Sequence, residues 1–293
     1  MNRAARMEMG RETVEIVEWG AYTSPGGRAV DIGEPVRACL EGTRFFSPEA
    51  LEEVRQEVLA RPAEGLDTRF EVVNETTLAG IARVLSDGHG PVAALNFASA
   101  KNPGGGFLGG SQAQEESLAR SSALHASLMR AWEFYEGHRA GSSLLYSDAM
   151  ILSPGCPVIR DDDGSLLEEP RMAGFITSAA PNAGAAASNQ PELLPLIPDA
   201  FRRRSEYVLA LAASQGYRRL VLGAWGCGVF RNDPRVVATA FADHLRRGAW
   251  AGRFERVVFS VLDNSPRLET FATFSRELLE EFPLFSASSA PSA

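Results

Sequence analysis

Five glycines and three polar side chains lie close together between residues 96 and 116, and their types and spacing suit binding and catalysis. The glycines follow the apolar run of residues 91–95, and Gln114, Glu115 and Glu116 follow the glycines. Glycine adopts positive φ and lets the backbone approach a ligand, so its N–H groups can bind phosphate oxygens. Adjacent carboxylates repel phosphate, so we expect them to face something else, most simply a sugar beyond the phosphates.

Two roles are open for the adjacent acids Glu115 and Glu116. Acids in the first turn of a helix suit the helix dipole, so helix capping is one role. The other is general acid catalysis at a glycosidic bond, worth roughly 10²–10⁴-fold in rate. Most glycosidases place two carboxylates about 5–9.5 Å apart on opposite sides of the sugar. Neighbouring helix residues point about 100° apart and cannot do this, so we expect one acid to transfer the proton and the other to orient the sugar.

A second glycine loop, residues 226–228, follows a predicted strand at residues 219–223. Ligands of α/β sheets bind at the carboxyl ends of strands, where two such loops could hold a diphosphate. Each charge-assisted N–H contact would contribute about 1.5–3 kcal/mol. The alternative is that both loops are only turns that require positive φ. Phe230 follows the second loop and either fills the core or packs against a ribose or a base.

The first loop also matches the pattern G-x-G-x-x-G through Gly104, Gly106 and Gly109, which is typical of nicotinamide-dependent dehydrogenases. That fingerprint requires an acid about 20 residues further on, at the end of the next strand. We expect a helix there, over residues 113–134, so a dehydrogenase is the weaker alternative. A Walker loop is excluded because no GK[ST] follows the glycines.

Glu75 lies at a predicted strand-to-helix turn, between Asn74 and Thr76. Either neighbour could cap the helix. Glu75 could instead accept a hydrogen bond from an adenine amino group.

The four histidines are scattered without metal-ligand spacing, so we expect no metal site.

From residue 68 onward the chain alternates strands and helices, which predicts an α/β sheet with helices on both faces. We expect residues 1–66 to be an N-terminal extension packed on the core, residues 67–283 to be the catalytic core, and residues 284–293 to be a disordered tail. The extension has helices predicted at 3–18 and 48–61 and a hairpin at 22–32. The core has strands predicted at 69–73, 91–96, 156–160, 166–168, 173–178, 219–223 and 256–262, and helices ending near 85, 134, 215, 247 and 281.

Composition limits the partners and the compartment. The 293 residues carry a formal charge of −8, which does not suit a nucleic-acid clamp, so we expect no direct contact with nucleic acid. The three cysteines form no disulfide framework and no CxxC pattern. The charged N-terminus has no apolar signal-peptide core, and no apolar run approaches membrane-spanning length. We therefore expect a cytoplasmic protein that does not contact a membrane.

At the glycine loops and the acids described above, the sequence resembles the bacterial type of poly(ADP-ribose) glycohydrolase. The shared signature is a glycine triplet followed shortly by Gln-Glu-Glu, here residues 104–106, seven further residues, and then residues 114–116. The resemblance runs from about residue 13 to residue 282 and includes the Asn-Phe-Ala of residues 96–98 and the loop at residues 226–230. It implies a macrodomain-like fold, a three-layer α/β/α sandwich with a mixed central sheet and an N-terminal helical extension.

The resemblance also implies residue roles. Glu116 would protonate the leaving ribose oxygen, and Glu115 would hold the distal ribose through its hydroxyls. The remaining substrate-binding residues would be Gly104, Gly105, Gly106, Gly226, Cys227, Gly228 and Val229 for the diphosphate, Phe230 and Asn102 for the distal ribose, Glu75 for adenine, and Gln114 of the signature.

The implied reaction is hydrolysis of the ribose–ribose O-glycosidic bonds of poly(ADP-ribose), with release of ADP-ribose and without a metal or cofactor. The chain has no counterpart of the long tyrosine-bearing insertion of the animal enzymes, so we expect cleavage mainly from chain ends. The implied partners are poly(ADP-ribose) and ADP-ribosylated proteins. We expect the protein to be a monomer and to act in the DNA damage response. The alternative is a non-catalytic macrodomain that only binds ADP-ribose.

Overall fold

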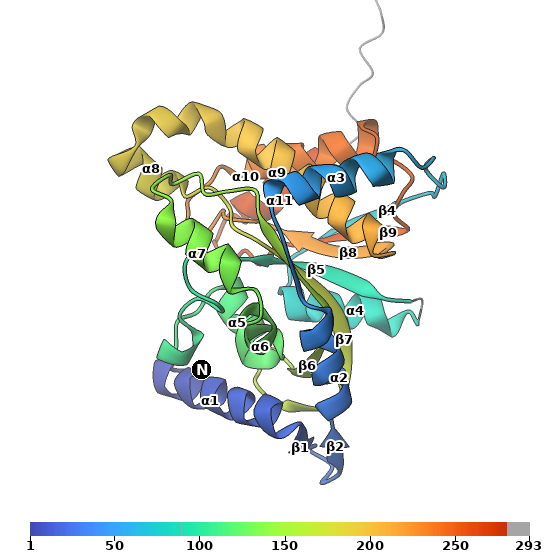
Figure 1. Ribbon diagram of the computed structural model, residues 1–293, viewed down its shortest axis with the longest axis vertical. Coiled ribbons are helices and arrows are strands. Elements are labelled where there is room, and N and C mark those ends of the chain that lie inside the picture. Colours follow the sequence, from blue (N-terminus) through green and yellow to red (C-terminus); the bar gives the residue numbers. More distant parts are fainter. Residues whose placement is uncertain (89, 280–293) are drawn as a thin grey trace, which may run out of the picture.

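The computed structural model describes residues 1–88 and 90–279. Within them a mixed sheet lies between two layers of helices, as Figure 1 shows, so the predicted α/β/α sandwich is confirmed. The disordered tail predicted at residues 284–293 lies outside the described residues.

Within the described residues seven strands form the sheet, and five neighbouring ones are parallel. The three central parallel strands, β5, β8 and β9, are buried on both faces, which explains why they appear in the sequence as short apolar runs. In spatial order the strands are β3 (Arg44–Phe46), β6 (Met150–Arg160), β7 (Leu166–Ser178), β5 (Val92–Phe97), β8 (Arg219–Gly223), β9 (Arg256–Ser260) and β4 (Arg69–Val73). Strand β6 runs antiparallel to both of its neighbours.

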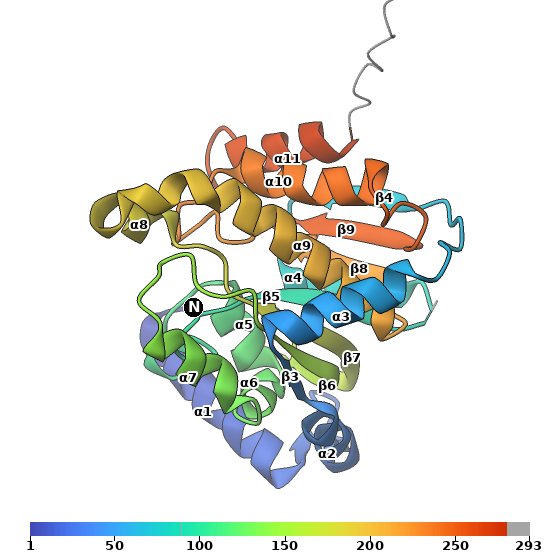
Figure 2. The ribbon, with the colours of Figure 1, turned by 45° about the horizontal axis from the view of Figure 1, so that its top comes forward.

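Each face of the sheet has its own hydrophobic core. Figure 2 shows one face covered by α3 (Pro48–Leu59), α9 (Ile197–Ser214), α10 (Pro234–Ala242) and α11 (Glu269–Leu279). The short helix α8 (Ala183–Asn189) precedes α9 in the chain. The other face is covered by α2 (Gly33–Gly42), α4 (Thr77–Ser86), α5 (Gln114–Ser121), α6 (Leu124–Leu128) and α7 (Trp132–Ala140). No helix within the described residues is long and apolar enough to cross a membrane.

The first 66 residues pack against this sandwich. Helix α1 (Arg3–Trp19) lies outside the α5 and α6 layer, and the hairpin of β1 (Ala21–Thr23) and β2 (Ala29–Asp31) follows it. The predicted hairpin and helices of this region are confirmed, but α2 and β3 were not predicted. Strand β3 pairs with β6 and forms one edge of the main sheet. The division at residue 66 stays a prediction, because the extension supplies a strand to the core.

One predicted helix and two predicted strands were wrong. The single helix predicted at residues 113–134 is three helices, α5, α6 and α7. The chain turns extended at Ser122, which forms a bridge to Val158 of β6, and the Ala123 amide donates to the carbonyl of Pro157 at 3.1 Å. The strands predicted at 166–168 and 173–178 are one strand, β7, with an irregular register against β6.

Candidate active site

The predicted site segments meet at one edge of the sheet. Strands β4, β5 and β8 are parallel, and their last residues are Val73, Phe97 and Gly223. The turn with Glu75 follows β4, the first glycine loop follows β5, and the second follows β8. Because ligands of such sheets bind at the carboxyl ends of strands, this edge is the candidate active site.

The first glycine loop turns tightly at Gly104 and Gly105, whose φ angles are +67° and +59°. The Gly105 amide donates to the Asn102 carbonyl at 2.9 Å and closes the turn. A Cβ atom added at Gly105 would overlap Oε1 of Glu116 and would lie 3.3 Å from Oε2 of Glu115. Only glycine fits there, and both carboxylates border the same turn.

Glu116 is half-buried in the first turn of α5. Its Oε1 accepts a hydrogen bond of 3.0 Å from the Gly106 amide. This contact joins the glycine triplet directly to the second acid of the signature and leaves part of the carboxylate open to solvent.

Glu115 has the opposite environment, because its side chain is buried at 2% exposure. Its Oε2 accepts from the Ser99 amide at 2.6 Å, and its Oε1 accepts from Nδ2 of Asn96 at 3.2 Å. Burial raises the pKa of Glu115 to about 8, with a smaller contribution from the charge of Glu116, against the lowering effect of these hydrogen bonds. At neutral pH the Glu115 carboxyl is therefore mostly protonated. The sequence reasoning missed Asn96 and Ser99 as its partners, although an asparagine directly after the apolar run 91–95 was a usable signal.

The side-chain amide of Gln114 forms hydrogen bonds within the protein. Its Oε1 accepts from the Phe97 amide at 2.9 Å, and its Nε2 donates to the Leu95 carbonyl at 2.7 Å and to Oγ1 of Thr77 at 3.1 Å. These bonds fasten the start of α5 to the end of β5. Its position beside the acids thus has a structural reason, and its predicted contact with the substrate stays a prediction.

The second glycine loop is fixed by Asn232, which the sequence reasoning also missed. Nδ2 of Asn232 donates to the Pro181 carbonyl at 2.7 Å and to the Gly226 carbonyl at 3.0 Å. Gly226 has φ +74°, and an added Cβ atom would lie 2.5 Å from the Cβ of Ala180. The tip at Gly228 and Val229 is exposed, so backbone amides there are accessible to a ligand.

Cys227 and Phe230 flank the exposed tip of this loop. Burial raises the pKa of the Cys227 thiol to about 12, so it stays protonated and is not a nucleophile at neutral pH. The Phe230 ring is half-buried and lies 6.2 Å from the Tyr146 ring between centroids. Tyr146 holds a positive φ of 60°, a conformation that needs support from its surroundings.

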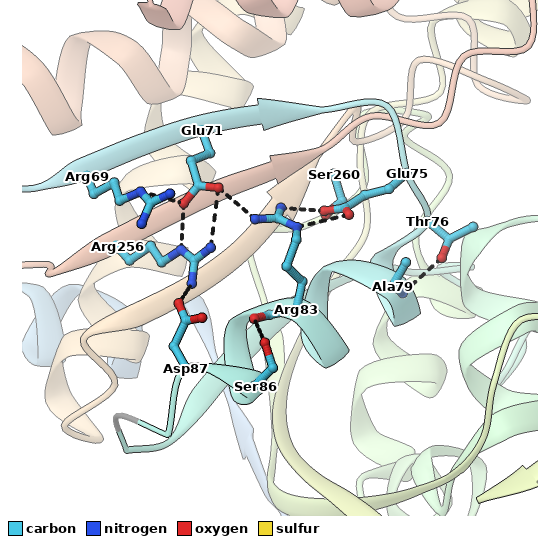
Figure 3. A network of polar contacts seen from close by, with 10 residues as sticks. All are labelled: Arg69, Glu71, Glu75, Thr76, Ala79, Arg83, Ser86, Asp87, Arg256 and Ser260. Carbon is cyan, nitrogen blue, oxygen red and sulfur yellow. Dashed lines mark hydrogen bonds and ion pairs between the residues drawn. The ribbon is translucent and has the colours of Figure 1, made fainter.

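Glu75 is held in the network of polar contacts in Figure 3. Its two carboxylate oxygens accept from Nε and Nη2 of Arg83 at 3.1 and 2.6 Å, and Oε1 also accepts from Oγ of Ser260 at 3.0 Å. The other end of the Arg83 guanidinium bonds Glu71 at 2.6 Å. The carboxylate is thus fixed in place by Arg83, and its predicted contact with adenine stays a prediction.

Asn102 is exposed at the start of the glycine loop, where its amide donates to Oγ of Ser99 at 3.2 Å. Its side chain is therefore accessible to a ligand, as its predicted role requires.

Across residues 1–88 and 90–279, no group of three or more His, Cys, Asp or Glu side chains could hold a metal ion.

Comparisons with known proteins show the family of the chain. Residues 10–161, over half of the chain, match the family model of the catalytic domain of microbial-type poly(ADP-ribose) glycohydrolase, PARG. None of the curated proteins matches the chain.

Three solved structures are similar over most of their length. PARG from Thermomonospora curvata has 48% identity and a TM-score of 0.89, covering 94% of this chain and 99% of that one. Its form bound to the inhibitor ADP-HPD has 48% identity and a TM-score of 0.86, covering 93% and 99%. PARG from Deinococcus radiodurans in complex with ADP-ribose has 49% identity and a TM-score of 0.78, covering 83% and 96%. The chain therefore belongs to the microbial-type PARG family.

Proposed function

We propose that the chain hydrolyses the ribose–ribose O-glycosidic bonds of poly(ADP-ribose) and releases ADP-ribose, mainly from chain ends. The observation that carries the proposal is the meeting of Glu115 and Glu116 at the Gly105 turn, where no side chain fits. Membership of the PARG family supports it, and a relative from Deinococcus radiodurans binds ADP-ribose.

In the proposed mechanism Glu116 is the general acid and base. It gives a proton to the leaving ribose oxygen while positive charge develops on the neighbouring sugar carbon, and its carboxylate then activates a water molecule. Because it is only half-buried, a substrate can reach it, and the Gly106 amide holds it in position. The buried Glu115 is unsuited to this exchange with solvent.

Glu115 orients the distal ribose in this proposal. With its pKa raised to about 8, the neutral carboxyl has an O–H that can donate to a ribose hydroxyl. Ser99 and Asn96 fix the direction of the group. Two adjacent acids with different environments thus divide the work between proton transfer and orientation.

The two glycine loops bind the diphosphate through backbone amides, and Phe230 and Asn102 contact the distal ribose. Glu75, fixed by Arg83, accepts from the adenine amino group. We also propose that the protein acts as a cytoplasmic monomer on ADP-ribosylated proteins in the DNA damage response, without direct contact with nucleic acid. Its three free cysteines suit a reducing compartment, and its charge of −8 argues against binding nucleic acid.

The test is an assay of the purified protein on radiolabelled poly(ADP-ribose), with products separated by chromatography. Wild type is compared with Glu116→Gln and with Glu57→Gln, a matched change at an exposed glutamate of α3. We expect free ADP-ribose from wild type and from Glu57→Gln. Glu116→Gln should lose at least about 10²-fold in rate, the lower limit for a lost general acid, and keep its affinity for ADP-ribose.

Near-normal turnover by Glu116→Gln would overturn the assignment of the acid. Polymer binding without product from any variant would support the alternative, a macrodomain that only binds ADP-ribose. Early appearance of short polymers, in place of free ADP-ribose, would contradict cleavage from chain ends.

A further inference from the structure

Helix α1 lies against the outer side of the first glycine loop, far in sequence from the acids. Nε of Arg3 donates to the Gly109 carbonyl, and Nε of Arg6 donates to the Gly110 carbonyl, each at 2.8 Å. These carbonyls end the short helical turn η1 (Phe107–Gly109), which begins directly after Gly106. We propose that Arg3 and Arg6 are positioning residues, which hold the glycine loop so that Gly106 meets Glu116.

Close packing supports this role, because glycine is needed on the loop side of the contact and leaves little spare room on the helix side. Gly110 has φ +73°, and an added Cβ atom would lie 2.5 Å from the Arg3 carbonyl oxygen. On the helix, an added Cβ atom at Gly10 would lie 3.3 Å from the Phe107 ring. The helix and the loop therefore approach as closely as their backbones allow, and a shift of one displaces the other.

A second contact joins α1 to the helix that carries the acids. Oγ1 of Thr13 donates to the Arg120 carbonyl at 2.6 Å, near the end of α5. The Arg120 guanidinium reaches back and donates to the Ser111 carbonyl at 2.7 Å. Helix α1 thus contacts the segment between Gly106 and Arg120 at both of its ends, and Glu116 lies inside that segment.

Helix α1 is itself anchored to the sheet. Arg160, buried at the end of β6, donates from Nε to Oγ1 of Thr13 at 3.2 Å and pairs with Glu12 at 2.5 Å. A rigid strand therefore supports the helix, and the helix supports the loop. Arg3 and Arg6 bind carbonyl oxygens, and among the contacts of the described residues neither pairs with a carboxylate. Their role therefore depends on hydrogen-bond geometry more than on charge.

The chemical consequence concerns the 3.0 Å contact between the Gly106 amide and Glu116. If the loop drifts outward, the acid loses its donor, and the reacting sugar loses the surface that places it. A displacement of about 1 Å at a reacting centre can cost about 100-fold in rate. This inference rests on the proposed function, but the position of the loop can be measured without activity.

The experiment compares wild type with the double variant Arg3→Ala/Arg6→Ala. Arg11→Ala, an exposed arginine on the same helix, is the matched control, and Arg3→Lys/Arg6→Lys is the rescue variant. Three quantities are measured: kcat and KM for release of ADP-ribose, amide hydrogen exchange of residues 106–111, and the thermal unfolding midpoint. A lysine can still donate one N–H to each carbonyl, so it should restore the loop.

We expect the double alanine variant to lose about 10- to 100-fold in kcat and to exchange the loop amides at least about tenfold faster. Arg11→Ala should match wild type, and the lysine variant should recover most of both quantities. The inference is overturned if kcat of the alanine variant stays within about twofold of Arg11→Ala. It is also overturned if loop exchange is unchanged, or if lysine restores the unfolding midpoint but not kcat. Wild type without activity would refute the proposed function, while faster loop exchange in the alanine variant would still support the contact.

Discussion

The side chain of Glu116 accepts a hydrogen bond from the amide of Gly106, ten positions earlier in the chain, at 3.0 Å. The two halves of the sequence signature, the glycine triplet and Gln-Glu-Glu, therefore meet directly. The seven intervening residues begin with the η1 turn and bring the chain back to the glycine triplet. Through this contact, the loop that is suited to binding phosphate also positions the acid.

Replacing Gly105 by alanine should stop turnover. The added methyl group would overlap Oε1 of Glu116, and alanine at φ +59° costs about 1–2 kcal/mol in backbone strain. We expect kcat to fall by at least about 100-fold, because the acid must move to make room. Gly109→Ala is the control, since among the described residues nothing lies within 4 Å of its added Cβ atom. Equal activity in the two variants would show that the acid is not positioned by this turn.

The titration of Glu115 should make stability depend on pH. Its pKa is raised to about 8 in the folded protein, against about 4.3 in the unfolded chain. Between these values the folded state binds more protons, so the free energy of unfolding falls as pH rises, by at most about 1.4 kcal/mol per pH unit. Glu115→Gln removes this dependence, so its stability relative to wild type should increase from about pH 5 to about pH 8.

Urea unfolding of both proteins across this range measures the effect, and their difference cancels contributions from other titrating groups. Parallel pH profiles would mean that the Glu115 pKa is not raised.

The sequence predicted local features well. The glycine triplet, the acids after it, and the strands at residues 69–73 and 219–223 each depend on neighbours within a few positions, and those strands have the predicted bounds. Placing both loops at one sheet edge needed only the rule for parallel strands. The fold and the positions of the site segments were therefore accessible from pattern.

Contacts between distant segments were not predictable in the same way. The buried environment of Glu115 depends on Asn96 and Ser99, and the second glycine loop depends on Asn232. The helix break at Ser122 results from its bridge to Val158 of β6, a pairing that local propensity cannot show. In each case a polar group is bound by a residue whose proximity exists only in the folded chain.

Replacing Arg83 by methionine should weaken nucleotide binding. Arg83 bonds both oxygens of Glu75, whose side chain is only 13% exposed, and also bonds Glu71. Without it two acids would face each other across a partly buried site, and the fixed direction of Glu75 would be lost. We expect a loss of about 1–3 kcal/mol in stability and a lower affinity for ADP-ribose, measured by calorimetry.

The control for that change is Arg69→Met, which also removes a partner of Glu71. Its ion pair is 3.0 Å long, but its side chain is 68% exposed, so the loss should be at most about 1 kcal/mol, with unchanged affinity. Affinity that is equal in the two variants would argue that Glu75 does not contact the nucleotide.

Replacing Asn232 by leucine should release the second glycine loop. The Asn232 side chain is almost fully buried and donates to the carbonyls of Pro181 and Gly226, which would lose these donors inside the protein. The Gly226 carbonyl would keep the backbone amide of residue 232 at 3.1 Å, but the Pro181 carbonyl would be left unpaired, which costs about 1–3 kcal/mol. Because the loop would no longer hold its amides in one arrangement, we expect the affinity for ADP-ribose to fall about tenfold or more, with KM raised more than kcat is lowered.

The control is Asn189→Leu, which should keep the affinity of wild type. Asn189 is exposed, and among the contacts of the described residues its side-chain amide bonds only its own helix. If Asn232→Leu binds ADP-ribose as wild type does while losing stability, the second loop does not contribute to ligand binding, and the diphosphate is held by the first loop alone.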